Sequence, residues 1–123
     1  MGKREKEKGA RGERMLVHFL ESLGLTAKRG YVFLKQSDLT GLAGIHVECK
    51  FVEALNVRKA MAQAISEAQK RKDGMPTVFW KKSREPWITI MLTEDWVKLY
   101  KLARWNTKSD VTERADSTVY EDE

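Results

Sequence analysis

Residues 37–50 read SDLTGLAGIHVECK, and this stretch decides how the chain folds. From residue 45 onward apolar and polar side chains alternate, which predicts a strand over residues 45–51 with one buried face. The polar positions on its other face are His46, Glu48 and Lys50. The glycine-containing segment before the strand, residues 36–44, predicts a turn that carries a further acid, Asp38.

Two carboxylates and an ammonium group in this arrangement suit the hydrolysis of a phosphodiester. That reaction needs a directed nucleophile and compensation for charge on the phosphate. Asp38 and Glu48 offer the oxygen ligands that Mg²⁺ prefers, and the backbone carbonyl of Cys49 offers a third. Lys50 can reach the attacking water or a phosphate oxygen. The alternative interpretation is a surface Glu-Lys pair on an exposed strand edge, beside a turn aspartate.

The composition describes a water-soluble globular chain of 123 residues, enough for one domain with a core. The only cysteine, Cys49, excludes an internal disulfide and a multi-cysteine zinc site, and we expect it to be a core residue. No apolar run approaches the roughly 20 residues that cross a bilayer. The N-terminus lacks the apolar segment of a signal peptide, so we expect no membrane partner and a cytoplasmic location.

Positive charge is concentrated in the body of the chain. The formal net charge is +5, with +8 over residues 1–103 and −3 over residues 104–123. A basic domain favours a polyanionic partner, although lysine and arginine clusters are commonly just solvated surface. We therefore expect a flexible basic arm over residues 1–9, a single domain over residues 10–105 and an acidic, disordered tail over residues 106–123.

Hydrophobic periodicity predicts alternating helices and strands. Helices are expected over residues 10–23, 57–71 and 93–103, with Gly24 after the first and Asn56 and Thr93 as N-caps of the others. Strands are expected within residues 26–34 and over residues 45–51, 76–80 and 87–92. This order predicts an α/β fold, a central mixed β-sheet flanked by helices.

Glu13 lies at the edge of the apolar stripe of the first predicted helix. An acid on the buried side of a helix is costly unless it is paired or associated with a metal. An acid near a helix N-terminus is also favoured by the helix dipole. The residues alone leave both interpretations open.

Three segments together resemble the PD-(D/E)xK nuclease superfamily. They are Gly9-x-x-x-Glu13 in a first helix, Ser37-Asp38-x-x-Gly41 in a turn, and apolar-x-apolar-Glu48-x-Lys50 in a strand. The chain is most similar to the archaeal-type Holliday-junction resolvases and their phage-encoded relatives. The segments KGARGER at residues 8–14 and LGLTAKR at residues 23–29 follow that group's pattern, and the resemblance covers about residues 8–53.

The resemblance implies a restriction-endonuclease-like core and a role for each matched residue. Asp38 and Glu48 would bind Mg²⁺ or Mn²⁺, Lys50 would position or activate the nucleophile, and Glu13 would complete the acidic site. Ser37 stands where the family motif often has proline. Family members are commonly homodimers that cut two strands symmetrically, which implies a homodimer here.

Further candidates lie around this motif. Some relatives carry a functional glutamine on the helix that corresponds to residues 57–71, which makes Gln63 a possible accessory residue, with exposed surface as the alternative. His46 could contact a metal-bound water or be structural. The expected contacts to the DNA backbone are Arg11, Arg14, Lys28, Arg29, Lys35, Lys81, Lys82 and Arg84. A hairpin with a solvated basic turn explains the last three equally well.

The sequence therefore predicts a Mg²⁺- or Mn²⁺-dependent endodeoxyribonuclease that resolves branched DNA such as Holliday junctions. One alternative is a nuclease of the same fold that acts on a linear duplex, a flap or a nicked strand. Another is a catalytically silent DNA-binding module. Retention of all four key residues argues against the silent module.

Overall fold

The computed structural model describes residues 3–31 and 37–106. The chain divides after Leu92 into two units, each of which is described by itself. The first unit contains a mixed five-stranded sheet with two helices, and the second contains the helix α3 (Thr93–Asn106). The domain expected over residues 10–105 is thus divided, and its role as a single nuclease domain stays a prediction. The expected tail lies outside the described residues, apart from Asn106, which ends α3.

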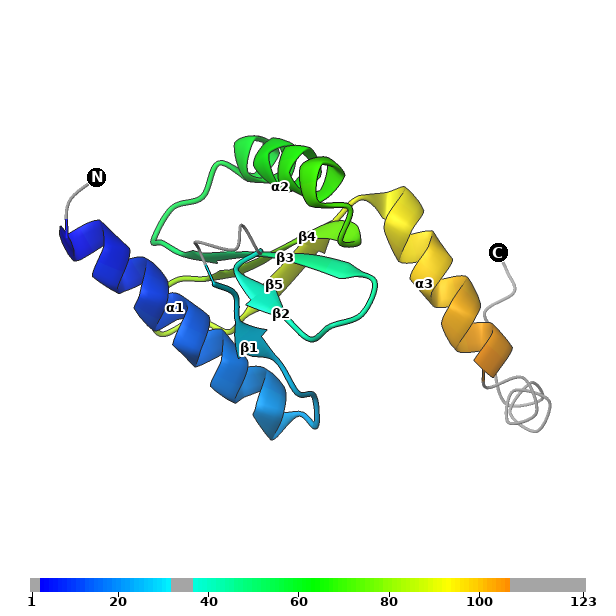
Figure 1. Ribbon diagram of the computed structural model, residues 1–123, viewed down its shortest axis with the longest axis horizontal. Helices are drawn as coiled ribbons and strands as arrows, with labels where there is room; N and C mark the ends of the chain where they lie inside the picture. Colours follow the sequence, from blue (N-terminus) through cyan, green and yellow to red (C-terminus); the bar gives the residue numbers. More distant parts are fainter. Residues whose placement is uncertain (1–2, 32–36, 107–123) are drawn as a thin grey trace. The chain divides into compact units, whose positions relative to one another are not determined.

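The sheet confirms the predicted α/β class. Its strands are β1 (Lys28–Arg29), β2 (Leu39–Thr40), β3 (Ile45–Phe51), β4 (Met75–Lys81) and β5 (Ile88–Met91). They lie side by side in the order β1-β2-β3-β4-β5. Among the strands of the described residues only the β3–β4 pair is parallel, and α2 (Val57–Arg71) connects its two strands (Figure 1). Parallel neighbours need such a crossover connection.

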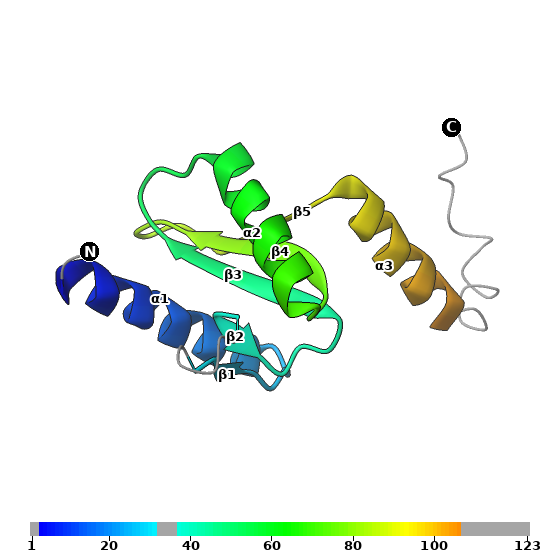
Figure 2. The same cartoon turned by 45° about the horizontal axis from the view of Figure 1, so that its top comes forward.

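The two helices of the first unit cover opposite faces of the sheet, as Figures 1 and 2 show. The first helix, α1 (Lys3–Ser22), packs Leu16 and Leu20 against Val47 and Leu39. On the other face, α2 packs three small or flexible residues against Val78; they are Ala60, Met61 and Ala64. Both faces of β3 are therefore covered, so its polar positions lie beneath α2.

The expected flexible arm over residues 1–9 is wrong for residues 3–9, because α1 begins at Lys3 instead of at about Ala10. Lysine, arginine and glutamate are strong helix formers. The helical preference of these residues outweighs Gly9, whose cost in a helix interior is about 1 kcal/mol. Within the same helix, Gly12 permits close packing, since a Cβ there would lie 2.7 Å from the Cβ of Phe51.

The predicted end of α1 is confirmed. Gly24 has a positive φ of 95°, and its N–H donates to the carbonyl of Glu21. The N–H of Leu25 donates to the carbonyl of Leu20. This pair of bonds is the Schellman motif, which satisfies carbonyls that the helix leaves free at its C-terminus.

The crossover from β3 to β4 follows the sequence prediction closely. Strand β3 and helix α2 have the expected bounds, and the side chain of Asn56 caps α2 by accepting from the N–H of Lys59 at 3.0 Å. Gly74 follows α2 with φ at 134°, and a Cβ at this position would lie 2.4 Å from the carbonyl carbon of Gly44. Only glycine accommodates this close approach, which sets the start of the parallel β3–β4 pair.

The turn expected over residues 36–44 also contains the short strand β2. Two residues are too few to produce an alternating pattern, so the sequence does not reveal this strand. Within the described part of the chain, no helix is both long and apolar enough to span a membrane.

Candidate active site

Asp38 is held at the edge of β3 by its own backbone and side chain. Its N–H donates to the carbonyl of Val47 at 3.3 Å, and its carboxylate Oδ2 accepts from the N–H of Cys49 at 2.7 Å. The β2–β3 register pairs Leu39 with Val47. Continuing that register by one residue brings Asp38, which immediately precedes β2, opposite Glu48 on β3, so the two predicted metal ligands are neighbours.

Ser37 shapes the turn that carries Asp38. Its buried hydroxyl donates to the carbonyl of Leu39 at 2.7 Å. Such a local side-chain bond stabilises a turn. Ser37, the predicted accessory residue, therefore stabilises the conformation of the turn. It stands where the PD-(D/E)xK motif often has proline.

The electrostatics of Asp38 show that the acidic residues lie together. Burial, followed by the charges of Glu48 and Glu13, raises the pKa of Asp38 to about 6, against the opposing hydrogen bond from Cys49 and the charge of Lys50. Like charges that share a poorly solvated site disfavour ionisation of each. A divalent cation would relieve this repulsion.

The predicted Glu48–Lys50 pair is present beneath α2. Lys50 Nζ lies 3.9 Å from Glu48 Oε2 and donates a 3.0 Å hydrogen bond to Oε1 of Gln63 on α2. Glu48 is only 7 % exposed, so the alternative of a surface glutamate on an exposed strand edge is wrong. Gln63 is an exposed residue that nevertheless contacts the lysine of the motif.

His46 is fully buried on the same face of β3. Its Nδ1 lies 2.8 Å from Oδ1 of Asp73, and its Nε2 lies 3.5 Å from Oε1 of Glu48. Burial is the largest single influence on the pKa of His46 and lowers it. The nearby carboxylates of Glu48 and Asp73 together outweigh burial, so the pKa of His46 is raised. The sequence does not identify Asp73 as a site residue, because it lies 27 positions from His46 along the chain.

Glu13 forms an ion pair with a residue that we expected on DNA. Arg29 Nε donates to Glu13 Oε1 at 2.9 Å, from β1 to α1. The sequence left open how a half-buried Glu13 is stabilised, and the structure gives it a charged partner, Arg29. A direct role of Glu13 at the metal, and a DNA contact by Arg29, stay predictions.

The chemistry of the site suits a magnesium ion held partly by water. Within residues 3–31 and 37–106, no three His, Cys, Asp or Glu side chains form a ready metal cluster. Mg²⁺ commonly uses one or two carboxylates and keeps several waters, and Asp38 with Glu48 meets that requirement. The N–H and carbonyl of one residue in a strand point to the same neighbour. Because the Cys49 N–H points to Asp38, the Cys49 carbonyl is directed to this edge too.

The sulfur of Cys49 contributes differently from its carbonyl. Burial, followed by the charge of Asp38, raises the pKa of the thiol above its ordinary value. The thiol therefore stays protonated, whereas a metal ligand must be a thiolate. The expectation of a core residue is consistent with its packing against the cluster around Leu16.

A groove lined by basic residues lies over α1 and the end of β3. It has a volume of about 690 Å³ and is referred to below as the Phe51 groove; its lining residues are Glu7, Lys8, Arg11, Arg14, Phe51 and Ser83. Three cations surround the Phe51 ring, with Lys8, Arg11 and Lys81 at 5.5, 5.7 and 5.8 Å from its centroid. These distances are typical of cation–π contacts.

Only some of the residues expected to bind DNA lie at this groove. Arg11, Arg14 and Lys81 lie in or beside it, while Lys28, Lys82 and Arg84 are exposed on β1 and the β4–β5 turn. Lys35 lies outside the described residues. Lys8 was missed because the segment before residue 10 was expected to be irregular. Its three-residue spacing from Arg11 would have revealed it once a helix was assumed.

The β4–β5 turn is attached to the end of β3. Glu53 accepts hydrogen bonds from both the hydroxyl and the N–H of Ser83, at 2.7 and 3.0 Å. Both bonds lower the pKa of Glu53, and the bond from the hydroxyl has the larger effect. They hold Ser83 at the rim of the Phe51 groove. This contact gives Glu53 a structural role at the groove, separate from the acidic site.

Comparison with known proteins adds no relative to this description: the chain matches no family model and no curated protein sequence.

Proposed function

We propose that this protein is a Mg²⁺- or Mn²⁺-dependent endodeoxyribonuclease with a restriction-endonuclease-like core. One observation carries the proposal: Asp38, Glu48 and Lys50 converge beneath one edge of β3, and the Cys49 N–H fixes the Asp38 carboxylate there. A buried glutamate and a half-buried aspartate whose charges repel each other are costly to a fold. Their retention beside a lysine favours a function that uses them.

Each of these residues has a defined task in phosphodiester hydrolysis. Asp38, Glu48 and the Cys49 carbonyl would hold the metal ion, which neutralises charge on the phosphate and makes a bound water more acidic. Lys50, oriented by Gln63 at 3.0 Å, would position the water that attacks phosphorus. The water oxygen would form the new bond to phosphorus and release a proton to solvent, while the P–O bond to the leaving sugar oxygen breaks and that oxygen takes a proton from solvent.

The Phe51 groove supports DNA as the substrate. Its cations lie along one side of α1, next to the strand that carries Lys50. Lysine and arginine side chains bind the phosphate backbone without reading sequence. The preference for branched DNA and action as a homodimer rest on the resemblance to the Holliday-junction resolvases. A linear-duplex, flap or nick substrate is the alternative within the same chemistry.

The test compares cleavage of a labelled four-way junction with that of a linear duplex of matched sequence, in Mg²⁺ and in EDTA. We expect Mg²⁺-dependent cutting that favours the junction. Lys50→Ala should bind the junction yet cut it poorly, while the control Lys70→Ala, an exposed lysine on α2, should cut normally. Equal cutting of both DNAs would remove the junction preference and keep the nuclease. Cutting that continues in EDTA would contradict the metal-dependent mechanism.

A further inference from the structure

The proposed chemistry leaves one buried polar feature without a task. His46 lies fully buried between the sheet and α2, next to Asp73 and Glu48. A buried polar group destabilises a protein unless it is hydrogen-bonded. An apolar residue would pack at this position without that cost. The position therefore requires an explanation beyond core packing.

The two nitrogens of the imidazole face different acids. Nδ1 lies 2.8 Å from Asp73, a hydrogen-bond distance that fixes the ring. Nε2 is directed to Glu48 Oε1 at 3.5 Å and has no hydrogen-bond partner within the part of the chain that the structure describes. A small movement of the Glu48 carboxylate toward the ring would complete this second bond.

The two oxygens of Glu48 are divided between two neighbours. Oε1 faces His46 at 3.5 Å, and Oε2 faces Lys50 at 3.9 Å. Each oxygen of the carboxylate thus has its own polar neighbour. Partners of this kind orient metal ligands in many sites, where their loss weakens metal binding.

We propose that His46, anchored by Asp73, is a positioning residue that holds the Glu48 carboxylate in its metal-binding orientation. This inference rests on the proposed metal-dependent function. His46 acts through Glu48 and does not touch the substrate. The Asp73–His46–Glu48 chain therefore connects the end of α2 to the metal site.

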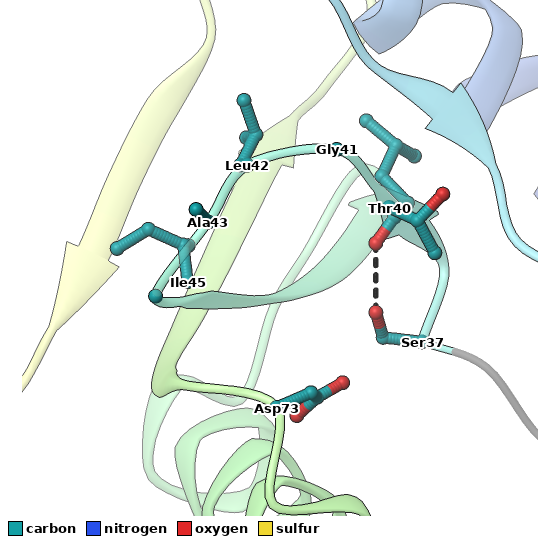
Figure 3. A pocket seen from close by; sticks show the side chains of 9 residues that line it. Ser37, Thr40, Gly41, Leu42, Ala43, Ile45 and Asp73 are labelled. Carbon is teal, nitrogen blue, oxygen red and sulfur yellow. Dashed lines mark hydrogen bonds between the residues drawn. The ribbon is translucent and has the colours of Figure 1, made fainter.

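The anchor lies at the accessible end of this chain. The side chain of Asp73 is 30 % exposed and lines a pocket of about 290 Å³, whose other walls come from residues 37 and 39–45 (Figure 3). The adjoining backbone is fixed by the left-handed Lys72 and by Gly74. Substitution of Asp73 therefore removes the anchor without opening a space in the core.

The first test measures Mn²⁺ affinity of the full chain by titration calorimetry in the absence of DNA. Asp73→Ala should bind Mn²⁺ about tenfold more weakly than wild type. Glu67→Ala is the matched control, because its side chain is 31 % exposed, pairs with Arg71 at 3.2 Å and carries the same charge on α2. It should bind Mn²⁺ as wild type does.

A second measurement separates positioning from a merely structural role. His46→Gln retains an amide that can approach Glu48 but has no ring to hold against Asp73. If Asp73 acts through His46, Asp73→Ala should weaken Mn²⁺ binding in the wild-type background and have no further effect in the His46→Gln background. Equal effects in both backgrounds would overturn the inference.

The results separate failure of the positioning role from failure of the metal site. Equal Mn²⁺ affinity of Asp73→Ala and Glu67→Ala overturns the positioning role while the metal site remains. A lowered melting temperature of Asp73→Ala in EDTA, with unchanged Mn²⁺ affinity, also overturns it, since Asp73 is then structural. If neither wild type nor Asp38→Asn binds Mn²⁺, the proposed metal site fails, and the positioning role fails with it.

Discussion

At the scale of single residues, Asp38 shows a conflict between stability and function. The fold holds its half-buried carboxyl group near Glu48, and partial burial together with that neighbouring charge raises the pKa of Asp38 from 3.8 to about 6. At neutral pH the protein must keep this group ionised in a place that disfavours its charge. Residues held in an unfavourable environment are expected where a ligand later compensates for it.

The sign of the resulting pH effect follows from linkage. A carboxyl group whose pKa is raised by folding stabilises the native state most below its unfolded pKa of 3.8, and this contribution is lost as the pH rises through about 6. Asp38→Asn keeps the acceptor for the Cys49 N–H but does not titrate. In EDTA, the variant should therefore become more stable than wild type as pH rises.

Urea unfolding of both proteins from pH 4 to pH 8 measures this difference. The advantage of Asp38→Asn should be small near pH 4 and grow to at most about 3 kcal/mol above pH 7. Saturating Mg²⁺ should reverse the order, because a ligand of the folded state stabilises only the protein that binds it. A difference that stays constant across this pH range would contradict the buried, repelled carboxylate.

The sequence identifies some of these residues and not others, for a physical reason. Asp38, Glu48 and Lys50 are close along the chain, so the alternation of one strand and a nearby turn suffices to place them together. The contact of His46 with Asp73 joins residues 27 positions apart. It depends on where the β3–α2–β4 crossover returns, which no local pattern specifies.

At the scale of elements, α1 differs most from its sequence prediction. Its first residues are helical, so Lys8 and Arg11 come one turn apart over the ring of Phe51. The charged composition of residues 1–9 predicted a solvated, irregular arm, because charged residues suit both an irregular arm and an exposed helix. The consequence for function is a longer basic face beside the site.

This face leads to a prediction about DNA binding. Lys8→Ala should weaken binding of a four-way junction and reduce the slope of log K against log salt concentration by about one, as expected for the loss of one phosphate contact. The matched control is Lys70→Ala, whose lysine is exposed on α2 outside the Phe51 groove. Fluorescence anisotropy over a salt series measures both. An unchanged slope for Lys8→Ala would exclude the groove as a path for DNA.

Other elements show how far periodicity reaches. The bounds of β3 and α2 match the prediction because both carry long, regular patterns and α2 has a side-chain cap. Strands β1 and β2 have two residues each. They form because β1 pairs with β2 and β2 pairs with β3. A segment of two residues does not indicate its pairing partner.

At the scale of the whole molecule, the fold explains why the site lies where it does. The mixed sheet brings β2 antiparallel to β3 on one side and β4 parallel to it on the other. The β2 side supplies Asp38, and the crossover to β4 supplies Gln63 and Asp73. One strand, β3, thus carries the central acid and lysine and receives their partners from both neighbours.

The sequence predicts this α/β class correctly, but not the division after Leu92. The helix expected over residues 93–103 is confirmed and extends to Asn106. Within α3, Trp96 and Tyr100 stack with ring centroids 5.5 Å apart. Periodicity defines a helix from local spacing, whereas its assignment to a unit depends on tertiary contacts that spacing does not contain.

The central claim is that Asp38 and its neighbours cleave DNA with a bound divalent metal. Its most direct test is single-turnover cleavage of a labelled four-way junction by wild type and Asp38→Asn, in Mg²⁺, with each protein in excess of its measured dissociation constant. We expect both proteins to bind the junction, and Asp38→Asn to cleave it more than about 100-fold more slowly than wild type. Cleavage by Asp38→Asn at the wild-type rate would contradict the account.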